Sequence, residues 1–137
     1  MGDGTGFDDV LLGLPGFVVT AVTEDRDELL VGIETVRGAA GCPTCGVIAR
    51  MKDRLRVVIR DLPAFGRRVR LVWSKRRFSC PEPDCEQGTW TECSDELPDR
   101  QVLSARAGRF CCRAVGEEAR SVSSLARWLD LLGLSNA

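Results

Sequence analysis

Two close pairs of cysteines carry the clearest chemical signal in this 137-residue chain. Two residues separate Cys42 from Cys45, and four separate Cys80 from Cys85. Thiolates at these spacings, brought together from two short loops, form the tetrahedral cage that Zn²⁺ prefers at structural sites. The sequence therefore predicts one structural zinc ion, with Cys42, Cys45, Cys80 and Cys85 as its ligands. Four thiolates also accept Fe²⁺, and disulfide bonding is the alternative without metal.

The absence of histidine narrows the chemistry further. It excludes Cys₂His₂ fingers, Ser-His-Asp triads, Cys-His dyads and histidine-ligated catalytic metals. A thiol-redox enzyme would need a thioredoxin-like βαβ pattern around Cys42 and Cys45, and no such pattern surrounds them. We therefore expect none of these catalytic arrangements and no thiol-redox enzyme.

The termini and the apolar runs indicate a cytoplasmic protein with no membrane partner. The segment Met1–Gly6 lacks the basic region and apolar core of a signal peptide. No apolar run approaches the ~18 residues of a membrane span. In a reducing cytoplasm, paired cysteines more often hold a metal than form disulfides. This setting favours the zinc interpretation, although the chain has an odd number of cysteines, seven.

Positive charge is concentrated between the two cysteine pairs. From Arg50 to Arg77 the chain has eleven basic residues and two acids, whereas the rest has eight basic residues and eighteen acids. A block of this kind suggests contact with phosphates. The alternative is a solubilising face that also helps to neutralise a dianionic zinc–thiolate centre.

Two strands are expected inside this basic block. Residues 54–62 and 67–78 alternate between apolar and polar side chains, with a turn at 62–66. Each strand then presents an apolar face to a core and an arginine face to solvent, and the second strand returns the chain to the first cysteine pair, as in a zinc ribbon. The arginines on this face that we expect to contact phosphates are Arg54, Arg56, Arg60, Arg68, Arg70 and Arg76.

The flanking segments complete an α+β fold. Residues 17–23 and 28–36 predict an N-terminal β-hairpin, which must pack on something because a lone hairpin is marginal in water. Beyond Pro98, Ser104 is a plausible N-cap, and a stripe from Leu103 to Val115 predicts a helix that ends near Gly116. Ser121 would cap a second helix.

The expected organisation is an N-terminal arm and hairpin (1–38), a Cys₄ zinc ribbon (39–95) and a helical pair (98–137). Cys93 is a spare ligand or a small packing residue.

Several of these pieces together resemble the N-terminal region of ISL-three family insertion-sequence transposases, over about residues 8–130. The resemblance rests on six short segments: Cys42-Pro43-Thr44-Cys45-Gly46, Ile59-Arg60-Asp61-Leu62-Pro63, Gly66-Arg67-Arg68-Val69-Arg70-Leu71, Arg76-Arg77-Phe78-Ser79-Cys80, Cys85, and Thr89-Trp90-Thr91-Glu92. Residues 121–127 also look like the first helix of the helix-turn-helix that follows the zinc module in that family.

The resemblance implies a role in DNA recombination and transposition. It implies zinc at the four cysteines and binding of double-stranded DNA at the terminal repeats of a mobile element. By comparison with the family, we expect the helix-turn-helix to be incomplete and the catalytic Asp-Asp-Glu domain to be absent. We therefore expect no strand cleavage, no catalytic residues and no small-molecule substrate. Two alternatives stay open. One is a non-functional transposase remnant. The other is a zinc-stabilised adaptor that binds a protein or forms a homo-oligomer through Trp73, Trp90 and Phe65 or through the helical stripe.

Overall fold

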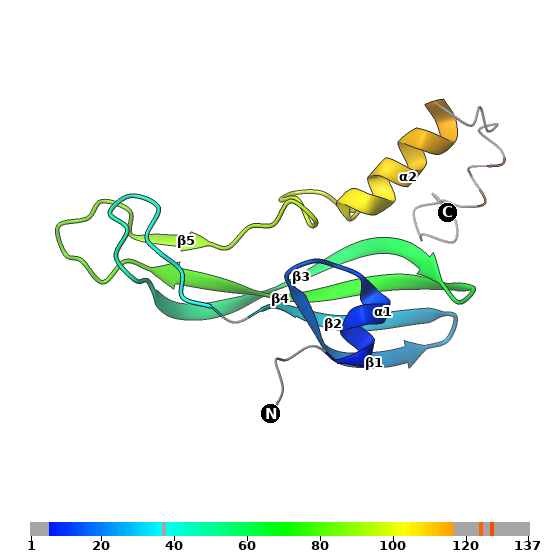
Figure 1. The fold of residues 1–137 in the computed structure, drawn as a ribbon, viewed down its shortest axis with the longest axis horizontal. Coiled ribbons are helices and arrows are strands. Elements are labelled where there is room, and N and C mark those ends of the chain that lie inside the picture. Colours follow the sequence, from blue (N-terminus) through cyan, green and yellow to red (C-terminus); the bar gives the residue numbers. More distant parts are fainter. Residues whose placement is uncertain (1–5, 37, 117–123, 125–126, 128–137) are drawn as a thin grey trace.

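The computed structural model describes residues 6–36, 38–116, 124 and 127. Within these residues it is an α+β fold in which two helices accompany one sheet (Figure 1). The elements are α1 (Phe7–Leu12), β1 (Phe17–Asp25), β2 (Glu28–Thr35), β3 (Arg50–Ala64), β4 (Arg67–Ser79), β5 (Thr89–Thr91) and α2 (Ala105–Gly116). The predicted fold class is confirmed, and both predicted hairpins are present.

The two hairpins share one sheet, with strand order β1-β2-β4-β3. β2 lies parallel to β4, with Ile33 opposite Trp73, whereas β1–β2 and β3–β4 are antiparallel. The short strand β5 pairs with the end of β4, where Trp90 lies opposite Phe78. The segments 1–38 and 39–95 therefore contribute strands to the same sheet, and the partner that the N-terminal hairpin needed is β4.

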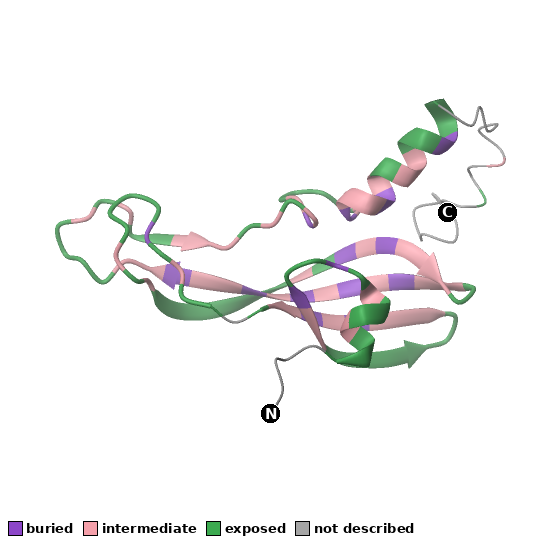
Figure 2. Cartoon of the chain, in the orientation of Figure 1, coloured by how far each residue is buried: buried purple, intermediate pink, exposed green. Residues whose placement is uncertain are grey.

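One face of the sheet forms the core, and buried positions recur along its strands (Figure 2). The predicted alternation holds in β4, where Val69, Leu71 and Trp73 are buried and the residues between them are partly exposed. Ile59 of β3 and Ile33 of β2 lie on the same face, and the ring of Phe17 meets Trp73 edge-on at 5.3 Å. Burying such side chains is the main favourable contribution to folding.

Helix α2 begins and ends as its sequence predicts. The Ser104 hydroxyl accepts a hydrogen bond from the Ala107 N–H at 3.3 Å, which is an N-cap interaction. Ala107 and Ala114 are buried on one side of the helix, and the element ends at Gly116. The predicted second helix from Ser121 lies almost wholly outside the described residues. No helix in the described part of the chain combines the length and the apolar character needed to cross a membrane.

Candidate metal centre and nucleic-acid interface

The first cysteine pair lies in a tight loop before β3. The Gly46 N–H donates to the Cys42 carbonyl at 2.9 Å, and the Cys42 N–H donates to the Val47 carbonyl at 2.8 Å. Gly46 has a φ of 78°, a left-handed conformation that glycine adopts without steric cost. These bonds close the loop and bring both sulfurs to one side of it.

The second pair lies in the loop between β4 and β5. Its ends are joined because the Cys80 N–H donates to the Gly88 carbonyl at 2.9 Å. A further hydrogen bond of 2.6 Å, from the Thr44 hydroxyl to the Gln87 side chain, connects the two cysteine loops. The ribbon hairpin β3–β4 thus returns the chain to the first loop, as the zinc-ribbon prediction requires.

The four sulfurs converge on one point. All four Sγ atoms lie within 4.8 Å of one another. The separations are 3.8 Å from Cys42 to Cys85 and 3.6 Å from Cys45 to Cys80. A tetrahedron with zinc–sulfur bonds of about 2.3 Å has sulfur–sulfur edges of about 3.8 Å, so the donor set fits one structural zinc. Cys93 is exposed and lies outside this cluster.

The thiols interact strongly with one another. Burial disfavours the charged form of Cys42, but N–H groups of Cys45 and Thr44 directed at its sulfur outweigh burial and lower the pKa of Cys42 to about 6. At Cys80, burial together with hydrogen bonds to the neighbouring thiols raises the pKa to about 12. Neighbouring thiols resist ionising together because each new thiolate would lie close to existing negative charge. A divalent cation removes that conflict and stabilises all four thiolates.

Comparison with known proteins agrees with this geometry. Residues 39–85 match one family model, and this range contains all four clustered cysteines. The matched family is the zinc-finger of transposase IS204/IS1001/IS1096/IS1165. The match covers about a third of the chain and confirms the transposase resemblance for this zinc ribbon. No curated protein and no solved structure matches the chain.

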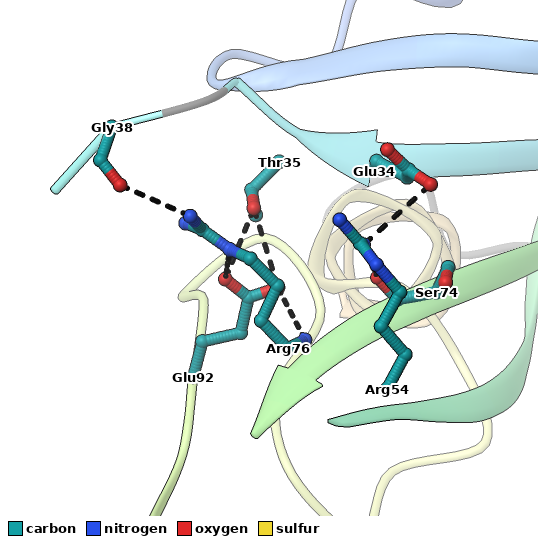
Figure 3. A network of polar contacts seen from close by, with 7 residues as sticks. All are labelled: Glu34, Thr35, Gly38, Arg54, Ser74, Arg76 and Glu92. Atoms are coloured by element: carbon teal, nitrogen blue, oxygen red, sulfur yellow. Dashed lines mark hydrogen bonds and ion pairs between the residues drawn. The ribbon is translucent and has the colours of Figure 1, made fainter. Parts of the chain in front are cut away.

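Two of the residues that carried the resemblance join the zinc ribbon to the N-terminal hairpin (Figure 3). Glu92 accepts hydrogen bonds from the Arg76 backbone N–H at 2.9 Å and from its Nε at 2.8 Å. The Thr35 hydroxyl, at the end of β2, donates to the same carboxylate at 3.0 Å. Arg76 also donates to the Gly38 carbonyl at 3.1 Å. This network occupies the point where β2 and β5 both end beside β4.

Asp61 forms a second internal network, which the sequence analysis did not identify. Its side chain is almost wholly buried, although it belongs to the basic block. The carboxylate accepts hydrogen bonds from the Ser104 hydroxyl at 2.7 Å and from Arg106 Nε at 2.9 Å, and a further one from Arg106 Nη2. Arg106 Nη1 donates to the Leu12 carbonyl at 2.6 Å. Asp61 and Arg106 therefore hold β3, α2 and the end of α1 together.

All six arginines selected from the sequence lie on the face of the sheet opposite the core. The strand register shows this. Arg60 lies opposite Arg70 and Arg54 opposite Arg76, and these pairs alternate along β3 and β4 with pairs whose side chains point to the core. Arg56 and Arg68 have no ion-pair partner among the described residues. The other four are paired with acids: Arg54 with Glu34, Arg60 and Arg70 with Glu28, and Arg76 with Glu92.

The acidic partners on this face were missed because they lie outside the basic block. The sequence did indicate these partners, because Glu28 and Glu34 are an even number of residues apart in the predicted second strand and therefore lie on the same face of it. Glu28, Glu34 and Glu92 together pair with four of the six arginines, so Arg56 and Arg68 are left as the two without an acidic partner among the described residues.

Proposed function

We propose that this chain is a zinc-stabilised DNA-binding module of a transposase, which binds the terminal repeats of a mobile element. In this proposal Cys42, Cys45, Cys80 and Cys85 hold one zinc ion with a structural role. The arginine face, defined as Arg54, Arg56, Arg60, Arg68, Arg70 and Arg76, contacts the phosphate backbone. The observation that carries the proposal is the convergence of the four sulfurs within a region that matches a transposase zinc-finger.

The arginine face suits phosphate recognition because of its chemistry and its spacing. Cross-strand neighbours such as Arg60 and Arg70 place two guanidinium groups side by side on a surface that the two paired strands hold in position. An arginine has five N–H donors, so one that bonds to a carboxylate keeps donors for a phosphate. Such contacts position a protein on DNA and carry little sequence information. We expect the unpaired Arg56 and Arg68 to contribute most to affinity.

Binding should be strongly salt-dependent. Changing Arg56 and Arg68 together to alanine should weaken binding to a short duplex and reduce the slope of log K against log salt by about 2, because about 0.9 of the slope comes from each phosphate that is neutralised. Fluorescence anisotropy between low and physiological salt measures both quantities. Arg109→Ala is the matched control, because it removes one arginine from the exposed side of α2. Wild-type affinity that does not change with salt would contradict the proposal.

A protein-interaction role is the second candidate, favoured by apolar side chains left exposed near α1. Phe7, Val10 and Leu11 of α1 are more than half exposed, and so are Val22 and Phe65. Leu11, Val22 and Phe65 border a hollow of about 290 Å³. Trp73, by contrast, is completely buried and is not available to a partner. Light scattering with and without DNA separates the two roles, since an adaptor would associate without nucleic acid.

A further inference from the structure

The turn between β3 and β4 presents one aromatic side chain to solvent. Phe65 is 85% exposed, more than any other large apolar residue in the described part of the chain. It occupies the first central position of a two-residue turn that connects Ala64 to Arg67. Its ring is not part of the core cluster, so the fold does not require it.

The backbone at Phe65 is strained. Its φ is 54°, and that of Gly66 is 74°, so both central residues have the left-handed backbone that type I′ hairpin turns require. Asparagine and glycine dominate such positions, and a bulky residue there is a conformational outlier. Strained residues of this kind cluster at functional sites, where another requirement retains them. An exposed aromatic ring in a strained turn therefore indicates a function outside the fold.

Two arginines lie close to this ring in the sequence. Arg67 and Arg68 come directly after the turn residues Phe65 and Gly66, and Arg68 lies on the arginine face. The turn between β1 and β2 lies at the same end of the sheet, because the Arg68 N–H donates to the Asp27 carbonyl at 3.3 Å. Acids share this end, and Arg67 is paired with Glu24 at 2.6 Å. The unpaired cation nearest to Phe65 in sequence is Arg68.

We propose that Phe65 contacts nucleobases when the arginine face is bound to DNA. This inference rests on the proposed function and deepens it. The arginine face holds the backbone, and the ring at the hairpin turn inserts at a base step or stacks on an unpaired base. Apolar wedges on β elements bind unstacked base steps in this way, and aromatic rings stack on any base because every base has a π-face. Phe65 would then be a base-contacting residue in a module whose other contacts go to phosphate.

The test uses opposite effects of one substitution on stability and on binding. Phe65→Asn places a residue preferred at this turn position, so the melting temperature should rise by about 2–6 °C. The same change removes the ring, so affinity for DNA should fall about tenfold. Phe65→Trp keeps a ring and should keep wild-type affinity within about twofold. Phe7→Ala removes another highly exposed phenylalanine, from α1, and should leave affinity unchanged.

Two short duplexes carrying 2-aminopurine identify the contact, one fully paired and one with a single unpaired base. Wild-type protein should change the 2-aminopurine fluorescence, and Phe65→Asn should not. A change on both duplexes indicates insertion at a base step, whereas a change on the second alone indicates stacking on an unpaired base.

If wild-type and Phe65→Asn bind equally well with the same fluorescence, the inference on Phe65 is wrong and the proposed function stands. If wild-type protein binds neither duplex at low salt, the proposed function itself fails. If Phe65→Asn abolishes self-association seen without DNA and leaves DNA binding unchanged, the ring serves a protein contact and the inference is overturned.

Discussion

Replacing Cys45 with serine should reduce bound zinc from about one ion per chain to nearly none. The serine hydroxyl is a poor zinc ligand beside three thiolates, and the remaining sulfurs would leave the ion an incomplete coordination shell. Structural zinc contributes on the order of 10 kcal/mol to the folding of small zinc modules. Metal analysis of protein purified without added metal measures the stoichiometry directly.

The structural consequence should be confined to one end of the molecule. The buried core consists of residues such as Ile33, Leu71 and Trp73, and none of the four cysteines belongs to it. We therefore expect the sheet to survive loss of zinc while the two cysteine loops lose their order. Hydrogen exchange should become fast at the amides of Cys42 and Cys80, which close these loops, and stay slow at Leu71.

Cys93→Ser is the matched control, because Cys93 is exposed and lies outside the cluster. It should retain one zinc ion and wild-type exchange. Equally protected loop amides in wild-type protein with and without a strong chelator would show that the metal does not hold the loops.

The sequence predicted features that depend on short-range spacing. The cysteine spacings predicted the cluster because each pair needs only one tight loop. The alternation along β4 and the second half of β3 predicted which side chains face the core, because successive residues of a strand point to opposite faces. In the first half of β3 it failed, since Leu55 is exposed. The loop of each cysteine pair and the two faces of each strand depend on residues a few positions apart, so local geometry determines them. The two pairs meet because the predicted hairpin returns the chain across the 43 positions from Cys42 to Cys85.

Features that depend on distant contacts were not predictable from these patterns. Nothing in residues 28–36 specifies that β2 pairs with β4, since either edge of a strand can accept a neighbour. The partners Arg76 and Glu92 are 16 residues apart, and Asp61 and Arg106 are 45 apart. Their charges suggested solvent exposure, but the fold brings each acid to a cation in the interior. The arginine face therefore carries less free charge than the sequence indicated.

Replacing Asp61 with asparagine should lower the free energy of unfolding by about 3 kcal/mol at neutral pH. The substitution preserves size but removes the charge that compensates Arg106, and losing one partner of a buried ion pair typically costs about 3–5 kcal/mol. We expect the lower part of this range because a quarter of the Arg106 side chain is exposed. Urea denaturation measures the difference. Glu24→Gln is the control, since Glu24 also pairs with an arginine but is mostly exposed, and it should change stability by less than about 1 kcal/mol.

The same substitution should have an effect that depends on pH. Burial alone would raise the pKa of Asp61, but the hydrogen bonds from Arg106 and Ser104 and the charge of Arg106 outweigh it and hold the pKa below its ordinary value. A carboxyl with a lowered pKa in the folded state stabilises the protein above its unfolded pKa of about 3.9, and the stabilisation is lost as pH falls through the folded value. The difference between wild type and Asp61→Asn should thus be constant from neutral pH down to about pH 5 and shrink in more acidic solution. A difference that stays constant throughout the acid range would show that Asp61 acts through packing and not through its charge.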